Sequence, residues 1–346
     1  MPADRNISTA VAEGRSSRLR VALAVVCLLS LCGCSRNAET IAVIPQTTAV
    51  TIWEAEHAGA DFAAGKSGVQ LYWNAPTSED DIRQQEALIE RIIDEHYSAL
   101  VLAPDQSLGL MAPVKRALAH NMRIVIVASS LPLPPGSGLS YIVNDDQASG
   151  RMAASRIGEI LHGSGRVAVL GVAPESLSSL AILHSFETTL EEKYPGITLS
   201  ERRFGTHNGT DAQQSAEEVL SSDRALDAIF TLSSVSSDGA AAALQSHGLT
   251  GRVKLVGFEQ SAELANLVRL GSMDSLIAEN TYEMGYRAVQ LLAQPRSSAP
   301  QEIRLQPTLI TRGNIASPEV RSLINTDWSR TRGNGIDESR TEGSRR

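Results

Sequence analysis

From residue 41 onward, short apolar runs alternate with longer segments of mixed polarity. The short runs are nearly continuous stretches of Val, Ile, Leu and Ala, the composition expected of strands that are buried on both faces. They predict strands at residues 41–45, 69–73, 99–103, 123–128, 141–143, 166–170, 197–204, 228–232, 253–258 and 275–278.

In the segments between these runs, apolar residues recur every three or four positions, as on one face of a helix. The clearest stripe is formed by Ile82, Leu88, Ile89, Ile92 and Ile93. Strands that alternate with helices form parallel sheets with right-handed crossovers. About ten strands exceed one small sheet, so we predict an α/β fold of two doubly wound parallel-sheet lobes.

The N-terminal segment has a different pattern, typical of an export signal. Arg15, Arg18 and Arg20 precede an apolar run at residues 21–31. This run is too short to span a bilayer, which takes about 20 residues, but it has the length of a signal-peptide core.

The apolar run ends in Leu-Cys-Gly-Cys at residues 31–34, which resembles a bacterial lipobox, although Cys32 is a less usual small residue there. We expect a lipoprotein signal peptide at 1–33, lipidation of Cys34 and a tether at 34–39. The chain would then be held in the cell envelope, on the extracytoplasmic side. The alternative is a soluble secreted protein with an ordinary cleavage site.

Composition narrows the functional classes. The 346 residues carry a formal net charge of −8, and no segment is basic enough to indicate nucleic-acid binding. Processing would leave Cys34 as the one cysteine, so we expect no internal disulfide. Residues 327–346 are rich in Ser, Arg, Gly and Glu and lack apolar periodicity, which predicts a disordered tail.

Several segments occur in the order found in one family: TIAVI at 40–44, ALVLAP at 99–104, NDD at 144–146, VGFE at 256–259 and LQPTLITR, as the closing strand, at 305–312. Over residues 40–314 the chain resembles the type I periplasmic binding proteins, the ribose-binding-protein-like substrate-binding lipoproteins of ABC transporters. Lactose-repressor-type regulators share this fold, but where they carry a DNA-binding headpiece this chain has the predicted leader.

The resemblance implies two lobes joined by a three-crossing hinge that includes Asn144 and Asp145. The expected N-terminal lobe is 38–143 plus 280–306, and the expected C-terminal lobe is 144–279 plus 307–326. A small polar ligand, a sugar or related polyol, would bind between the lobes and be delivered to ABC permease subunits. We expect no enzyme activity, no cofactor and no nucleic-acid partner. A sensory module for a membrane receptor, or a degenerate member with a non-sugar ligand, are the alternatives.

Ligands of open parallel sheets bind at the carboxyl ends of the strands. The polar and aromatic residues that follow the predicted strands are therefore the candidate ligand contacts: Gln46, Trp53, Ser129, His207, Ser233, Glu259 and Glu279. Relatives that bind ribose carry an Asp-Arg pair where this chain has Ala128 and Ser129, and an arginine at Ile182. The chain should therefore not bind ribose in the same way.

Each candidate also has a simpler interpretation. Trp53 could be a core aromatic beneath the cleft, His207 a solvated loop residue, and Glu279 the partner of a hinge residue. Glu259 precedes the predicted helix around Leu264, where an acid would act as an N-terminal cap.

Motifs of the common enzyme classes are absent from the sequence. The seven histidines form no His-x-x-x-His pair, so no metal site is predicted. Neither a Gly-x-Ser-x-Gly elbow nor a Walker sequence occurs. A carboxylate pair could serve a glycosidase, but nothing else in the sequence supports hydrolysis.

Overall fold

The computed structural model describes residues 39–48, 52–78, 81–206, 208–296 and 299–325. The predicted signal peptide, the lipidation residue Cys34, His207 and the predicted tail at 327–346 lie outside these residues. Within the described ranges, no helix is both long enough and apolar enough to cross a membrane.

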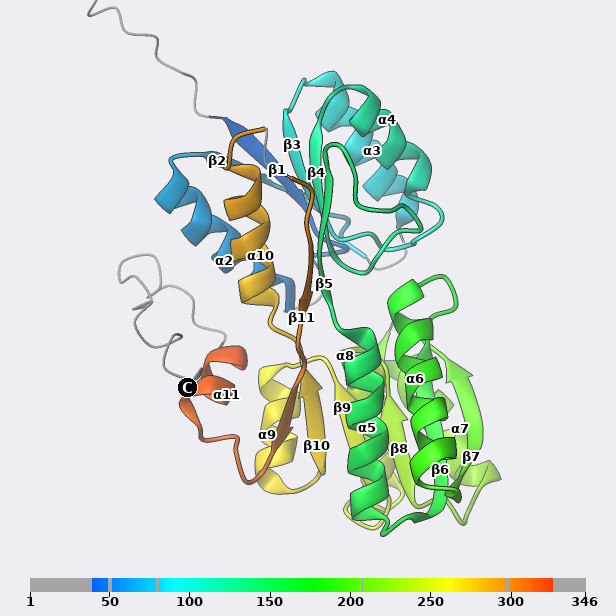
Figure 1. Cartoon of the computed structure of the whole chain (residues 1–346). Helices are drawn as coiled ribbons and strands as arrows, with labels where there is room; N and C mark the ends of the chain where they lie inside the picture. Colours follow the sequence, from blue (N-terminus) through cyan, green and yellow to red (C-terminus); the bar gives the residue numbers. More distant parts are fainter. Residues whose placement is uncertain (1–38, 49–51, 79–80, 207, 297–298, 326–346) are drawn as a thin grey trace, which may run out of the picture. The chain divides into compact units, whose positions relative to one another are not determined.

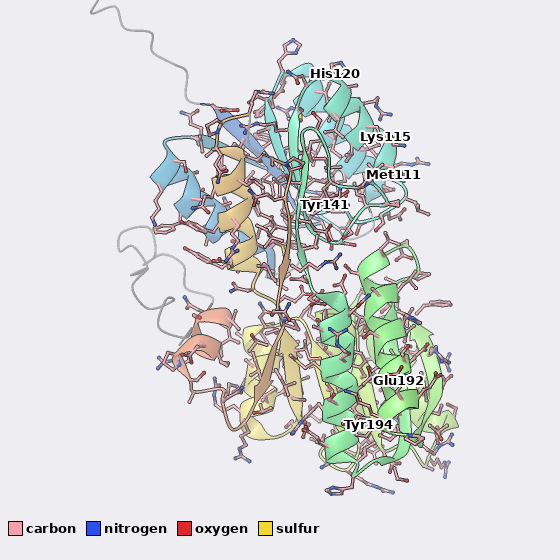
Figure 2. All side chains as sticks on the ribbon, in the orientation of Figure 1. Met111, Lys115, His120, Tyr141, Glu192 and Tyr194 are labelled. Atoms are coloured by element: carbon pink, nitrogen blue, oxygen red, sulfur yellow. The ribbon has the colours of Figure 1, made fainter. Side chains whose placement is uncertain are left out.

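The first described sheet has six strands, each parallel to its neighbours (Figure 1). Its order is β11 (Glu302–Leu305), β5 (Leu139–Asn144), β4 (Arg123–Ala128), β3 (Ala99–Leu102), β1 (Thr40–Ile44) and β2 (Gln70–Trp73). Tyr141, labelled in Figure 2, lies on β5, and its hydroxyl donates to the Leu133 carbonyl at 2.5 Å.

Helices cover both faces of this sheet because successive strand residues point to opposite sides. Ile41 and Val43 of β1 pack with α2 (Ile52–Ser67) and α10 (Thr281–Leu292). Their neighbours Ala42 and Ile44 pack with the other pair of helices, α3 (Ile82–Asp94) and α4 (Met111–Ala119).

The second described sheet repeats this arrangement. Its order is β12 (Thr308–Thr311), β10 (Ser275–Ala278), β9 (Lys254–Phe258), β8 (Ala228–Thr231), β6 (Ser164–Val172) and β7 (Gly196–Phe204). β12 is antiparallel to β10, and the other neighbours are parallel. One face packs against α5 (Asp146–Ile160) and α6 (Leu177–Lys193).

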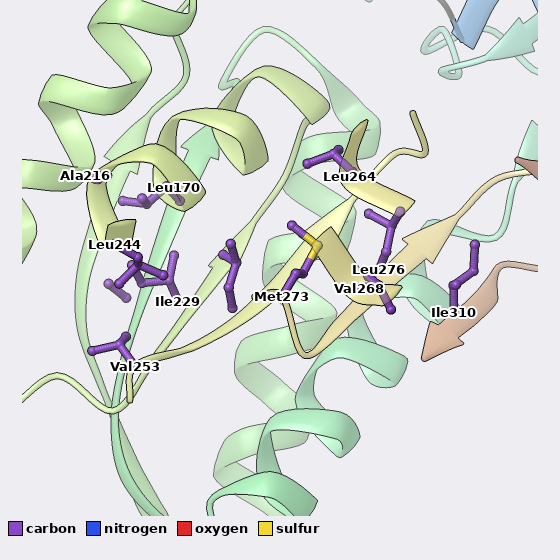
Figure 3. Packing of buried hydrophobic residues seen from close by; sticks show 14 of the residues in the cluster. Leu170, Ala216, Ile229, Leu244, Val253, Leu264, Val268, Met273, Leu276 and Ile310 are labelled. Carbon is purple, nitrogen blue, oxygen red and sulfur yellow. The ribbon is translucent and has the colours of Figure 1, made fainter. Parts of the chain in front are cut away.

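The opposite face packs against α7 (Gly209–Ser222), α8 (Ser234–Ser246), α9 (Ala262–Leu270) and α11 (Pro318–Leu323). Figure 3 shows the apolar side chains that form this layer, with Leu170 and Ile229 from the sheet and Leu244 and Leu264 from the helices. The two predicted α/β lobes are therefore present, each with its own two-sided core.

The chain passes between the two sheets at three places: from β5 to α5, from β10 to α10 and from β11 to β12. Backbone and side-chain bonds tie the first and third crossings together. The Asp145 amide donates to the Leu305 carbonyl at 2.8 Å, and Gln306 Nε2 donates to Asp145 Oδ2 at 3.0 Å. Asp145, predicted as a hinge residue, also caps α5 by accepting from the Ala148 amide.

The segment 305–312, expected as the closing strand, is divided between the sheets. β11 ends at Leu305 in the first sheet, and β12 begins at Thr308 in the second. Pro307 lacks the amide hydrogen that a continuous ladder would need, and the chain changes sheets there.

Glycines allow two pairs of helices to pack with their backbones in close contact. A Cβ on Gly285 of α10 would lie 2.1 Å from the Glu56 carbonyl oxygen of α2, and a Cβ on Gly59 would lie 2.0 Å from that of Tyr282. In the second lobe, a Cβ on Gly150 would lie 2.3 Å from the Ile182 carbonyl oxygen.

We predict that Gly285→Ala lowers the free energy of unfolding by roughly 1–3 kcal/mol, because the helix backbones must separate to admit the methyl group. The matched control is Gly65→Ala, in the same α2 helix, where nothing lies within 4 Å of the added Cβ. This control should raise stability by about 0.5–1 kcal/mol, since alanine favours helix. Urea denaturation measures both; equal effects would show that the α2–α10 contact is not tight.

Candidate ligand-binding site

A cavity of about 470 Å³ lies among the carboxyl ends of the strands of both sheets. In the first lobe its lining follows β1, β3 and β4 and includes the end of β5. In the second lobe it includes the end of β6 and follows β6, β7, β8, β9 and β10. This volume is in the range of small-molecule sites, about 300–1,000 Å³.

Six of the seven predicted contact residues line this one cavity: Gln46, Trp53, Ser129, Ser233, Glu259 and Glu279. The predicted hinge residue Asn144 lines it as well, whereas Asp145 is not in the lining. His207 lies outside the described residues. Residues far apart in the sequence thus meet in one place, and their role as ligand contacts remains a prediction.

Gln46 and Trp53 form the part of the lining that comes from β1 and α2. Gln46 Nε2 donates to the Pro104 carbonyl at 3.0 Å, which fixes the amide against the loop that follows β3. Trp53 is 8% exposed and packs in the core between α2 and the sheet. Because the protein covers most of the side chain, little of Trp53 is available to a ligand.

Two buried hydroxyls line the cavity without a protein hydrogen-bond partner among the described residues. Ser129 follows β4 and is 4% exposed, and Thr281 begins α10 and is 2% exposed. Burying a hydroxyl without a partner is unfavourable by about 1–3 kcal/mol. Both hydroxyls are therefore available to a water molecule or a ligand in the cavity. Thr281 was not among the predicted contacts.

Glu259 binds the beginning of α8, not α9. Its Oε2 accepts from the Ser234 amide at 2.8 Å and from the Ser234 hydroxyl at 3.0 Å. The alternative interpretation as a cap of the helix around Leu264 is wrong, because Ser261 caps that helix. The Ser234 amide at the start of α8 is a favourable partner for the Glu259 carboxylate, because helix N-termini carry partial positive charge. Ser233, another predicted contact, is itself the N-cap of α8.

Glu279 is the most perturbed carboxyl in the lining. It is 8% exposed, and burial together with the charges of Glu259 and Asp146 raises its pKa well above the usual 4.5, against a hydrogen bond from Asn144. That bond agrees with the interpretation of Glu279 as the partner of a hinge residue. Burial also raises the pKa of Glu259, although the Ser234 bonds oppose it.

Two non-glycine residues of the lining have left-handed backbone. Ala128 at the end of β4 has a φ of 59°, and Glu259 directly after β9 has a φ of 62°. Each is unfavourable by roughly 1 kcal/mol for a residue with a side chain. These positions are equivalent in the two lobes, since each ends the fourth strand of its lobe.

The sequence analysis missed two acidic residues of the lining, Asp105 and Glu175. Both could have been found, because Asp105 lies three residues past the end of β3 and Glu175 three residues past the end of β6. Glu175 belongs to the loop between β6 and α6. In that loop the Glu175 carbonyl accepts from the Ser107 amide, and the Leu177 amide donates to Ser107 Oγ, both at 3.3 Å.

Comparison with known proteins agrees with this architecture. The family described as periplasmic binding protein domain matches residues 41–295. The chain belongs to the periplasmic binding protein family. Members of this family are solute-binding components of transport systems rather than enzymes, and the family is extracytoplasmic.

Sequence similarity to known relatives extends over most of this periplasmic binding protein. It is 25% identical to the D-allose-binding periplasmic protein of Escherichia coli over 262 residues, or 74% of this chain and 84% of the relative. It is 23% identical to the xylitol-binding protein of Mycolicibacterium smegmatis over 261 residues, or 74% and 73%.

Two solved structures with the same fold are solute-binding proteins, one of an ABC transporter and one of a carbohydrate transporter. One, from Agrobacterium vitis, is bound to α-D-tagatopyranose; it has a TM-score of 0.76 and 26% identity, covering 82% of this chain and 98% of that one. Another, from Agrobacterium radiobacter in complex with D-arabinose, has a TM-score of 0.78 and 21% identity, covering 84% and 100%.

We predict that Glu279→Gln makes the ligand-free protein more stable than wild type as pH rises. A carboxyl whose pKa is raised in the folded state contributes most below its unfolded value of 4.5 and loses that contribution as pH increases. Glutamine is isosteric with the protonated acid and does not titrate. Urea denaturation at pH 5 and pH 8 should show the advantage of the variant growing with pH.

The control is Glu192→Gln, at the exposed end of α6 (Figure 2), which should follow the wild-type pH profile. If the difference between Glu279→Gln and wild type is the same at both pH values, Glu279 is not a strained buried acid.

Proposed function

We propose that this protein is a lipid-anchored receptor that captures a sugar or polyol between its lobes for an ABC importer. The observation that carries the proposal is the cavity at the carboxyl ends of both sheets, lined by polar groups from each lobe. The unpartnered hydroxyls of Ser129 and Thr281 add support, since ligand hydroxyls would satisfy them. The relatives named for D-allose and xylitol bind molecules of this class.

Ribose is the member of this class that the lining favours least. Ala128 and Ile182 both line the cavity, at the positions where ribose-binding relatives carry charged residues. Charge-assisted hydrogen bonds contribute about 1.5–3 kcal/mol each. We therefore place the ligand among other sugars and polyols.

A thermal-shift screen with D-allose, xylitol, D-arabinose, D-tagatose and ribose should identify a ligand. At 100 times its dissociation constant, a ligand stabilises the fold by about 2.7 kcal/mol. The screen also includes amino sugars and amino polyols; no shift with any neutral or amino member would overturn the proposal.

For the ligand found, we predict that Ser129→Ala weakens binding about 2- to 12-fold, since a hydrogen bond contributes about 0.5–1.5 kcal/mol. The stability of the free protein should not fall, because the hydroxyl has no protein partner in the described part of the chain. The control is Ser140→Ala on β5, whose Oγ accepts from the Gln301 amide at 3.1 Å. It should lower the melting temperature and leave affinity unchanged; the reverse pattern would remove Ser129 from the site.

The lipid anchor rests on the sequence at residues 31–34. We predict that processing leaves Cys34 as the first residue, and that Cys34→Ser moves the protein from the membrane fraction to the soluble fraction. Several acyl chains are enough for stable anchoring, whereas one gives marginal binding. Cys27→Ser, within the apolar run, is the matched control and should remain with membranes. A Cys34→Ser variant that still sediments with membranes would contradict lipidation.

A further inference from the structure

The cavity has a strongly one-sided charge. Four acidic residues line it, Asp105, Glu175, Glu259 and Glu279, and no Lys, Arg or His is among the described residues of the lining. A neutral sugar needs hydrogen-bond donors as well as acceptors, and an ionised carboxylate can only accept. The lining is therefore better supplied with acceptors than a purely neutral ligand requires.

Two of these carboxyls, Glu259 and Glu279, are close enough to affect one another. Glu259 follows β9, Glu279 follows β10, and the charge of Glu259 disfavours ionisation of Glu279. Asp146, at the start of α5, adds to this repulsion, and Asn144 at the end of β5 opposes it. Asp146 is in turn faced by Ser178 of α6 at 2.7 Å, by Arg304 of β11 and by Asp145.

Among the described residues, no cation lowers the pKa of Glu259 or Glu279. The groups that lower the pKa of Glu259 are the amide and hydroxyl of Ser234, and only Asn144 lowers that of Glu279. In the ligand-free protein these raised pKa values favour keeping a proton on the pair, and a positive charge that entered would favour its release. Two neighbouring carboxyls behave in this way because each negative charge disfavours ionisation of the other.

A second feature of the cavity is independent of the acids. The Ser129 and Thr281 hydroxyls, both more than nine-tenths buried, line the same cavity and have no protein partner within the described ranges. They come from the first lobe, whereas Glu259 and Glu279 follow strands of the second. The lining thus offers free hydroxyls to ligand hydroxyls and two neighbouring carboxyls to a positive group.

We propose that the ligand bears a protonated amine in addition to hydroxyls, as an amino sugar or amino polyol does, with the ammonium between Glu259 and Glu279. This rests on the proposed function and narrows its ligand class. An ammonium donates three charge-assisted hydrogen bonds. A divalent metal is a poorer fit, since no cluster of three or more His, Cys, Asp or Glu side chains suited to a metal occurs among the described residues.

The test compares matched pairs by calorimetry on the purified full chain: D-glucosamine with D-glucose, D-galactosamine with D-galactose, and 1-amino-1-deoxy-D-sorbitol with D-sorbitol. Members of a pair differ in one group, so the contribution of the amine is isolated. We expect at least one amine to bind roughly 10- to 100-fold more tightly than its neutral parent. If the neutral parents and the sugars of the screen bind as tightly as the amines, the inference fails and the proposed function stands. If neither class binds, both fail.

Proton release gives a second readout that a merely polar contact would not produce. Entry of an ammonium stabilises the ionised form of Glu279, so protons leave the protein on binding. Affinity should then rise with pH until the ligand amine itself loses its proton. The apparent binding enthalpy should differ between phosphate and Tris buffers, which take up protons with different heats. A buffer-independent enthalpy for the preferred amine would overturn the inference.

Two variants complete the design. Glu279→Gln should abolish both the preference for the amine and the buffer dependence. Glu175→Gln removes a half-buried acid elsewhere in the lining and should preserve both effects. If Glu279→Gln retains the preference for the amine, the ammonium does not lie at Glu279. Folding of each variant is checked by its melting temperature without ligand.

Discussion

Parallel strand order is the constraint on which the rest of this structure depends. In each lobe, parallel neighbours bring the carboxyl ends of the strands to one edge of the sheet, where the next helices begin. Residues just beyond the strands therefore converge whatever their separation in the sequence. Gln46 and Glu279, separated by most of the chain, line one cavity for this reason.

The strained residues lie at the same edge. The chain must turn sharply at the end of β4 and β9, and it does so through left-handed backbone at Ala128 and Glu259. Glycine would adopt this conformation more easily. At residue 259 a side chain is kept, and it binds the start of α8 through Ser234. The strained backbone at residue 259 carries a carboxylate that binds the N-terminus of α8 and also lines the cavity. A glycine there would have no carboxylate.

Much of this architecture could be predicted from the sequence, because buried parallel strands are continuous apolar runs and their ends are easy to locate. The rule that ligands bind after strands led to six residues that line the cavity. The rule was applied too narrowly, because it missed Asp105, Glu175 and Thr281, which each lie three residues past the end of a strand. The lobe boundary between residues 306 and 307 was expected from the resemblance alone, since residues on both sides of Pro307 have strand composition. The partner of Glu259 was also missed, since α8 lies 25 residues away along the chain.

A second buried acid shows why burial alone does not mark the site. Glu56, on α2, is fully buried against α10, and burial raises its pKa to about 8. Neither of its carboxyl oxygens has a hydrogen-bond partner in the described part of the chain. It is absent from the cavity lining, and no other charge contributes to its shift. Glu56 is therefore not a candidate ligand contact, because it is fully buried and does not line the cavity.

Glu279 is also buried, but it lines the cavity, and the charges of Glu259 and Asp146 disfavour its ionisation. A positively charged ligand in the cavity would relieve this repulsion. Glu279 can therefore act in binding, whereas Glu56, buried away from the cavity, cannot.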